Sequence, residues 1–257
     1  MVKRLLELFS GTHSIGKEAH KKGYEVYSLD KNLGAGCPFG TEYKSYKHFQ
    51  EDILTWNYKQ YPKGYFHLIT ASPVCLWWSP LQRTWIGRKR KGMDRPFTAQ
   101  DIQDNINKYG KPMVDKVREI INYFQPKYYC IENPATGSMK KYITDLPFHI
   151  VDYCKYAPEW GYKKSTILWT NIKIKPKICK KDCKAMYITK TQAIHKCRMG
   201  TSKTIIDNGK IIRCNTKELR NKYKNYKNIT STHDKMTKKY ERYRIPPLLI
   251  NDILNNC

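Results

Sequence analysis

Acidic residues are scarce in this sequence of 257 residues. Aspartate and glutamate together number 22 against 48 lysines and arginines, which gives a formal net charge of +26 and an isoelectric point near 9.7. This excess favours a nucleic-acid partner, because neutralising phosphates releases counterions, and it predicts binding that weakens steeply with salt. An AT-rich coding sequence would also enrich lysine, so charge alone does not identify the partner.

Long hydrophobic runs are also missing. Residues 1–10 are too short for a secretion signal and already belong to an expected strand, and no stretch is apolar enough to cross a membrane. We therefore expect an intracellular protein, cytoplasmic or nuclear, with no membrane partner. Its nine cysteines should then be reduced thiols rather than disulfides.

Two apolar or aromatic runs end in residues that can do chemistry. Residues 65–70 and 128–131 have the composition of strands buried on both faces of a parallel sheet. Cys75 follows the first run and Glu132 the second, and ligand sites lie at the carboxyl ends of such strands. A thiol beside an acid can attack an electron-poor ring and protonate a ring nitrogen, which suits chemistry at C5 of a pyrimidine. Taken singly, each residue could be an inert thiol or an ordinary loop carboxylate.

The N-terminal part predicts a nucleotide-binding unit. Residues 6–16 indicate a strand, a glycine turn and the start of a helix, and a second strand ends at Asp30, about twenty residues past the turn. An acid at that place accepts ribose hydroxyls. Glu51 and Asp52 end a possible third strand and could meet an adenine amino group.

These segments together resemble the C5-cytosine methyltransferase family, which uses S-adenosylmethionine. The turn at residues 9–12, then Asp30, then Asp52 with Ile53, are similar to its first three motifs, and residues 73–75 and 132–134 to its Pro-Cys and Glu-Asn-Val motifs. Residues 154–156 with 163–171 resemble the next block, and residues 245–249 the end of the last. The matches are in family order, span most of the chain and look closest to compact phage and viral members.

The resemblance implies a Rossmann-like α/β fold, a mostly parallel sheet with helices on both faces, plus a small basic target-recognition region. It implies these cofactor contacts: Phe9, Ser10, Gly11, Thr12, His13, Ser14, Asp30, Lys31, Asp52, Ile53, Pro73 and Val74. The implied catalytic residues are Cys75, Glu132, Asn133 and Lys163.

In the implied mechanism, Cys75 as thiolate adds to C6 of cytosine while Glu132 holds a proton on N3 and Asn133 orients the base. Positive charge nearby should lower the pKa of the thiol, and Lys163, Lys164 and Arg83 are the candidates.

Four departures from the family pattern bear on activity. His13 replaces a glycine of the cofactor turn and could narrow the pocket or add a donor; Val74 replaces a proline, and Lys155 a glutamine. Residues 242–244 stand where Gly-Asn is usual. The nucleophile, the acid and the ribose-binding carboxylate all remain, so we favour an active enzyme over an inactive DNA-binding protein on the same fold.

The stretch after the nucleophile suggests contact with nucleic acid. Six basic residues lie within residues 83–95, around Trp85 and Gly87, in what would be a mobile loop in the family. Trp77, Trp78 and Trp85 could stack on bases or fill the gap left by a flipped base, or simply pack. The predicted nucleic-acid contacts are Trp77, Ser79, Arg83, Arg88, Lys89, Arg90 and Lys164.

The chain divides by composition into three segments. We expect a catalytic domain at 1–171, a basic recognition region at 172–239 that is poor in large apolar residues, and a helix within 240–257 that returns to the catalytic domain. Helices are predicted at 99–124 and 245–254. The Asn208-Gly209 pair predicts a hairpin between strands 203–207 and 210–214.

Five metal-binding residue types fall in the basic region: Cys179, Cys183, His195, Cys197 and Cys214. Four of them could form a tetrahedral zinc site, but the spacing lacks the tight C-x2-C pair of well-known fingers. Free thiols are the preferred interpretation, so no metal is predicted. Cys37, Cys130, Cys154 and Cys257 carry no pattern.

The sequence thus predicts a DNA cytosine-5 methyltransferase that acts as a monomer. The same chemistry on RNA, as in the transfer-RNA branch of the family, is the first alternative, and a catalytically inactive DNA-binding protein is the second. The recognition sequence, a preference for hemimethylated DNA and a restriction endonuclease partner are all left open.

Overall fold

The computed structural model describes residues 2–32, 46–190, 192–195, 197–198, 203–227, 229, 231–232 and 243–257. Cys37 and Arg242, singled out above, lie outside these ranges, as does the side chain of Cys197. Within the described part of the chain, the helices are all too short or too polar to cross a bilayer.

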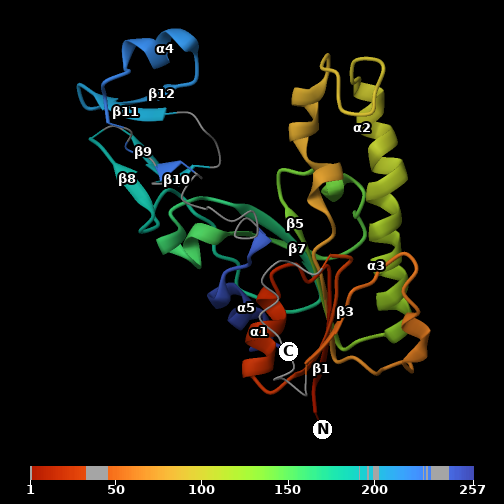
Figure 1. Cartoon of the computed structure of the whole chain (residues 1–257). Helices are drawn as coiled ribbons and strands as arrows, with labels where there is room; N and C mark the ends of the chain where they lie inside the picture. The colour runs from red at the N-terminus through yellow and green to blue at the C-terminus, as the bar shows by residue number, and fades with distance from the viewer. Residues whose placement is uncertain are drawn as a thin grey trace.

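A seven-stranded sheet forms the centre of the molecule (Figure 1). Its strands in spatial order are β3 (Tyr46–Phe49), β2 (Glu25–Leu29), β1 (Arg4–Leu8), β4 (Leu68–Ala71), β5 (Tyr128–Pro134), β7 (Ser165–Thr170) and β6 (Phe148–Asp152). Neighbouring strands are parallel except for β7, which runs antiparallel to both β5 and β6. The sheet confirms the predicted Rossmann-like fold.

Both faces of the sheet are covered, which explains why its central strands are apolar throughout. On one face α3 (Lys111–Phe124) buries Val114, Val117 and Phe124 in a cluster rich in aromatic side chains. On the other face α1 (Ser14–Lys21) and the C-terminal α5 (Pro247–Leu254) pack together over Leu5 and Leu68. Figure 1 shows the two layers on opposite sides of the strands. The C-terminal helix α5 thus packs against the same face of the sheet as α1.

The predicted helix at 99–124 is present, but it is interrupted. Helix α2 (Ala99–Asn105) begins at a capping box formed by Thr98 and Asp101, and a π turn at Ile106–Gly110 joins it to α3. Pro112 explains the interruption, because proline has no N–H to donate and its ring excludes the carbonyl four residues before it. The helix therefore widens just before the proline.

The segment after β7 forms small, separate pieces of structure. They are β8 (Met186–Ile188), β9 (Ala193–His195), β10 (Cys197–Arg198), β11 (Lys203–Asp207), β12 (Lys210–Cys214), α4 (Lys217–Lys222) and β13 (Ser231–Thr232). The β11–β12 hairpin has the predicted boundaries, and Asn208 and Gly209 both take the positive φ that its turn requires. Ile205, Cys214 and Tyr223 form its small core. In Figure 1 this segment lies at the end of the molecule away from α3.

Candidate active site

The strand order places two loops of the sheet beside each other. From β1 the chain moves outward to β2 and β3, and it then returns to β4 on the other side of β1. The turn after β1 and the loop after β4 therefore flank the point where the strand order reverses, which is where open α/β sheets bind ligands. The first turn is the predicted cofactor turn, and the second loop carries Cys75.

The nucleophile loop is held by short helical turns. After Ala71, the chain passes through Pro73 into a 3-10 helix at Cys75–Trp78, and a second one at Pro80–Trp85 begins with the Ser79 hydroxyl accepting a hydrogen bond from the Leu81 amide. The buried Gln82 donates to the Trp77 carbonyl at 2.7 Å. Cys75 is left half-buried at the start of the first turn.

The predicted acid lies next to this loop. Glu132 and Asn133 are buried near the end of β5, and the Asn133 side-chain amide donates to the Pro73 carbonyl at 2.8 Å, which ties the two predicted motifs together. Tyr153 donates to a Glu132 oxygen at 3.1 Å, and the Lys164 ammonium is 3.6 Å from the same oxygen. Tyr153 was not predicted from the sequence, because nothing in its spacing marks it.

The electrostatics at Cys75 differ from the prediction. Burial raises the pKa of the Cys75 thiol, the Glu132 carboxylate raises it further, and Lys164 lowers it without reversing the shift. The free site therefore holds a thiol rather than a thiolate at neutral pH. Because one contribution comes from the negative charge on Glu132, a proton on that carboxyl group would make Cys75 easier to ionise.

Of the three cations expected near Cys75, only Lys164 acts on it. The Lys163 ammonium instead pairs at 3.1 Å with Asp152, a buried carboxylate at the end of β6. Arg83 is exposed on the second 3-10 helix, and no charge effect of Arg83 on the thiol is found. The structure thus places Lys164, rather than Lys163, beside Cys75 and Glu132, the predicted catalytic residues.

The predicted cofactor turn is tightly wound. Phe9, Gly11 and His13 all have positive φ, of 57°, 46° and 53°, so the backbone reverses within a few residues between β1 and α1. The Gly11 amide donates to the Asp30 carboxylate at 3.0 Å, and the Ile15 amide donates to the buried Glu7 at 3.1 Å. Left-handed backbone of this kind gathers at ligand sites. Glu7, which sequence analysis missed, anchors the first turn of α1.

The acids at the ends of β2 and β3 lie on the same edge of the sheet. Asp30 accepts hydrogen bonds from the backbone at Gly11 and Asn32. Asp52 pairs with Lys31 at 2.9 Å, and hydrogen bonds from Lys31 and from the Leu54 amide lower the pKa of the Asp52 carboxyl. The Ile53 side chain is buried in the main core, so only its backbone could meet a ligand.

A cavity of about 400 Å³ opens beside the cofactor turn. Its lining combines polar side chains of the turn with charged and aromatic residues from elsewhere: Thr12, Ser14, Lys17, Glu18, Glu159, Trp160, Arg244, Ile245 and Pro247. The Arg244 guanidinium lies 3.9 Å from the Trp160 ring centre, and the Ile245 amide donates to the Ser14 hydroxyl. The segment that follows residues 242–244 therefore contacts the cofactor turn through the Ile245 amide, and Arg244 lines the cavity beside it.

His13 does not line this cavity. Its side chain is buried and packs edge to face on His48, with ring centres 4.9 Å apart. Burial, His48 and Lys17 together lower the pKa of His13 to about 4, so the ring is neutral at pH 7. The replacement of glycine by histidine is accommodated toward β3, rather than by filling the space beside Thr12 and Ser14.

Of the predicted nucleic-acid contacts, Arg83 and the three basic residues at 88–90 are exposed, whereas Trp77, Ser79 and Lys164 are only partly exposed. Arg88, Lys89 and Arg90 are exposed, and Arg90 stacks over the Trp85 ring at 4.0 Å. Trp77 is partly exposed and stacks on Tyr109 of the π turn. Trp78 is buried in the main core, so the suggestion that it meets bases is wrong. Gly110 makes room for it, since a Cβ there would lie 3.0 Å from the Trp78 ring.

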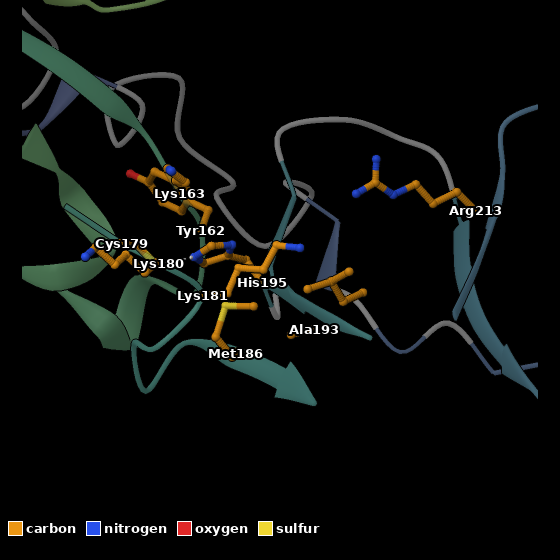
Figure 2. Close-up of a pocket in the computed structure, with 10 residues that line it drawn as sticks. Tyr162, Lys163, Cys179, Lys180, Lys181, Met186, Ala193, His195 and Arg213 are labelled. Atoms are coloured by element: carbon orange, nitrogen blue, oxygen red, sulfur yellow. Dashed lines mark hydrogen bonds between the residues drawn. The ribbon is translucent and has the colours of Figure 1, made fainter. Parts of the chain in front are cut away.

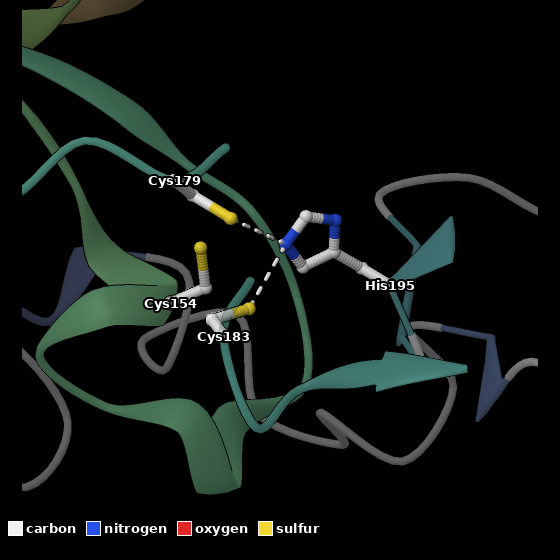
Figure 3. A group of neighbouring side chains, drawn as sticks. All are labelled: Cys154, Cys179, Cys183 and His195. Carbon is white, nitrogen blue, oxygen red and sulfur yellow. Dashed lines mark hydrogen bonds between the residues drawn. The ribbon is translucent and has the colours of Figure 1, made fainter. Parts of the chain in front are cut away.

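A wider hollow of about 660 Å³ lies in the basic region rather than at Cys75 (Figure 2). Its lining includes Lys163, Lys180, Lys181 and Arg213. At one side of this hollow, His195 approaches three cysteines, Cys154, Cys179 and Cys183 (Figure 3). Cys214, considered above as a candidate ligand, instead packs in the hairpin core with Ile205 and Tyr223. Cys154, which has no pattern in the sequence, takes its place.

Comparison with known proteins finds a viral relative in sequence. Over 269 aligned residues, the chain is 31% identical to the probable DNA (cytosine-5)-methyltransferase of Frog virus 3 (isolate Goorha), and the match covers 99% of this chain and 100% of that protein. No protein-family model matches the chain.

Solved structures are more distant. A putative DNA modification methyltransferase encoded within a prophage of E. coli is 16% identical, with 68% of this chain and 51% of that one covered and a TM-score of 0.41. The Dnmt2 methyltransferase of S. pombe is 20% identical, with 70% and 54% covered and a TM-score of 0.35. The chain spans about half the length of these two proteins.

Proposed function

The chain belongs to the DNA (cytosine-5)-methyltransferase family, and on that premise we propose that it methylates C5 of a flipped-out cytosine in DNA, with Cys75 as nucleophile and Glu132 as acid. The observation that carries the residue assignment is the contact between the two loops. The Asn133 amide holds the Pro73 carbonyl at 2.8 Å, two residues before Cys75 and next to Glu132.

The groups near Glu132 position its carboxyl group to share one proton with N3 of the base. Tyr153 and Lys164 both address Oε1 of Glu132, at 3.1 and 3.6 Å, and so fix the orientation of the carboxyl group. The other oxygen is then left to share a proton with N3 of the base. A proton held there removes the negative charge that raises the pKa of Cys75, so protonation of the ring and ionisation of the thiol support each other.

The covalent steps use the Cys75 thiolate as nucleophile and the Glu132 carboxyl group as proton donor. The Cys75 thiolate adds to C6 of cytosine while Glu132 supplies a proton to N3, which makes the ring an enamine that is nucleophilic at C5. After the methyl group has been accepted at C5, transfer of the C5 proton to water and expulsion of Cys75 as thiolate restore the aromatic ring. Return of the N3 proton to Glu132 resets the site.

The residues of the cofactor turn fit S-adenosylmethionine. Asp30 can accept ribose hydroxyls, since each of its oxygens has a further lone pair beyond its backbone contact. The cavity beside Thr12 and Ser14 carries both Glu159 and Arg244, which suits the paired charges of an amino-acid end. The bound cofactor supplies an electrophilic methyl group on a sulfonium. The buried Ser10 hydroxyl has no partner among the described residues and could bond to it.

A DNA substrate agrees with the basic surface after the nucleophile. A cytosine within a duplex is out of reach of Cys75, so it must leave the stack at a cost of a few kcal/mol. Arg88, Lys89 and Arg90 are exposed on the loop that follows Cys75 and could bind the adjacent phosphates. Trp77, supported by Tyr109, offers an aromatic face near the same loop.

The test is transfer of labelled methyl from S-adenosylmethionine to mixed-sequence duplex DNA and, in parallel, to transfer RNA. We expect label in 5-methylcytosine of DNA with the native chain and none with Cys75→Ala. Label on transfer RNA alone would move the proposal to the RNA alternative. No label on either, together with no cofactor binding by calorimetry, would favour the inactive DNA-binding protein.

A second assay isolates the covalent step. In DNA that carries 5-fluorocytosine, C5 has no proton to lose after methylation, so the adduct with Cys75 cannot resolve. We expect a protein–DNA complex that survives denaturation and requires both Cys75 and the cofactor. A complex that still forms with Cys75→Ala would overturn the assignment of the nucleophile.

A further inference from the structure

Four metal-binding side chains from three separate segments converge outside the catalytic pair (Figure 3). Cys154 follows β6, Cys179 and Cys183 lie in the loop before β8, and His195 ends β9. Their ligand atoms, three Sγ and one imidazole nitrogen, all lie within 4.8 Å of one another. Side chains 41 residues apart in the sequence thus point at one centre.

The spacing of these atoms suits a tetrahedral ion. With metal–sulfur bonds of about 2.3 Å and metal–nitrogen bonds of about 2.05 Å, the edge between a sulfur and a nitrogen of a tetrahedron is about 3.6 Å. The His195 Nε2 lies 3.7 Å from Cys179 Sγ and 3.4 Å from Cys183 Sγ. None of the three cysteines is in a disulfide.

The loop between Cys179 and Cys183 brings the two sulfur atoms to the same side. Lys181 has φ 66°, in the left-handed region, which turns the chain sharply between the two cysteines. The backbone amides of Lys181 and Asp182 are directed at the Cys179 sulfur. Amides directed at sulfur are the supporting contacts that metal thiolates use.

The cluster is anchored to the catalytic sheet. The buried Asp152, at the end of β6, accepts a hydrogen bond from the Cys179 amide at 2.7 Å, and Lys155 pairs with Asp182 at 2.9 Å. Cys154 directly follows Tyr153, the residue that contacts Glu132. One centre therefore joins the loop of the basic region to the strand end that supports the catalytic acid.

The surroundings also suit the charge of such a site. A zinc ion with three thiolates and a neutral histidine carries one net negative charge. Lys163, Lys180 and Lys181 line the hollow beside Cys179 and His195 and can balance it. Hydrophobic burial stabilises this cluster only weakly, since its buried hydrophobic members besides the cysteines are Ala185 and Met186.

We propose that Cys154, Cys179, Cys183 and His195 bind a structural zinc ion that fastens the basic region to the end of β6. All four positions are filled by protein ligands, so the ion has no open site for substrate and acts in folding rather than in catalysis. Binding replaces up to three thiol protons, which are released to solvent. The proposal does not depend on the methyl-transfer assignment.

The first test is metal content of the untagged full chain, measured by mass spectrometry of the elements after purification without chelator. We expect about one zinc per chain, as for a closed four-ligand site. Cys183→Ser and His195→Ala should lower zinc affinity by more than the 10- to 100-fold that removal of a supporting hydrogen bond costs. Cys214→Ser is the matched control, because Cys214 is buried in the same region but outside the cluster, and it should keep its zinc.

Cobalt substitution tests the ligand set directly. Cobalt bound by the native chain should show the intense visible bands of a tetrahedral site and a sulfur-to-metal charge-transfer band. His195→Cys should keep the ion and strengthen the charge-transfer band, which separates ligand loss from misfolding. Native protein without stoichiometric metal and without a tetrahedral cobalt spectrum would overturn the proposal, as would a Cys179–Cys183 disulfide or zinc retained by Cys183→Ser.

Discussion

The catalytic sheet and the basic region after β7 differ in the size of the hydrophobic clusters that stabilise them. The strands that carry the cofactor turn, Cys75 and Glu132 lie between two extensive hydrophobic clusters, one on each face of the sheet. Apart from Ile172 and Ile174, which pack in one of these large clusters, the described residues of the basic region form the small cluster around Ile205 and the cysteine cluster around Cys179. Burial therefore fixes the geometry of the chemistry, whereas the part expected to select the target depends on a few contacts.

The largest expected effect is a loss of methyl transfer without a loss of stability, on removal of the Cys75 thiol from the edge of the sheet. Cys75→Ala should lower methyl transfer by at least about 10³-fold, the scale on which loss of a nucleophile acts, because the other described thiol near Glu132, Cys130, is buried within β5. Its melting temperature should remain near that of the native chain. Single-turnover assays and calorimetry measure the two quantities, and Cys257→Ser serves as the control that keeps both.

Matched core truncations test whether the two regions differ in stability. Leu68→Ala in the central strand β4 should destabilise the chain by about 3 kcal/mol, as for other buried leucines. Ile205→Ala in the hairpin should leave the main unfolding transition in place and increase hydrogen exchange only around β11 and β12. If Ile205→Ala lowers the main transition as much as Leu68→Ala does, the two regions unfold as one and do not differ in this way.

Charge removal at the two ends of the sheet tests where DNA lies. The double variant Arg88→Gln with Lys89→Gln should reduce the slope of log affinity against log salt by about 2, one for each phosphate that is no longer neutralised. Lys63→Gln with Lys127→Gln removes the same charge before β4 and β5, at the opposite end of the strands, and should leave the slope unchanged. Equal slopes for the two variants would mean that DNA binds without regard to the catalytic edge.

The smallest expected effect is a shift of the pH profile of kcat/KM, which should follow substitution of Lys164 but not of its neighbour Lys163. Lys164 lowers the pKa of Cys75, so Lys164→Gln should raise that pKa further and move the alkaline rise of kcat/KM to higher pH. At neutral pH the rate falls about tenfold for each unit of pKa. Lys163→Gln, whose native partner is Asp152, should leave the pH profile in place, and Lys164→Arg should restore it. A shifted profile for Lys163→Gln would return Lys163 to the catalytic group.

The sequence predicted best where local signals and long-range packing agree. The β11–β12 hairpin follows from Asn208 and Gly209, and the sheet strands follow from runs that only a doubly covered sheet can bury. The order of the motifs along the chain also predicted that Cys75, Glu132 and Asp30 lie at one edge of the sheet, where the parallel strands end. Each of these rests on a regular period or on the rule that parallel strands end together.

The features that the sequence could not predict depend on contacts between distant segments. Trp78 looked like a base-stacking residue, but the missing side chain of Gly110 admits it to the core. Lys163 and Lys164 are the same residue type, and only the fold brings one to Asp152 and the other to Glu132 just before β7 begins. Cys154 lies 25 residues before Cys179, too far for a spacing rule to join them.

Because of the π turn before Pro112, the stacking of Tyr109 on Trp77 of the nucleophile loop depends on the number of residues in the helix. One residue of a helix corresponds to about 100° of rotation, so the extra residue of a π turn sets the rotational phase of α3 relative to α2. Tyr109 faces Trp77 while Val114 and Val117 face the sheet. Deleting the exposed Asn107 or Lys108 would keep Tyr109, Val114 and Val117, yet it would rotate one of these two faces away from its partner. The length of this helix is therefore as much a part of the active site as any side chain in it.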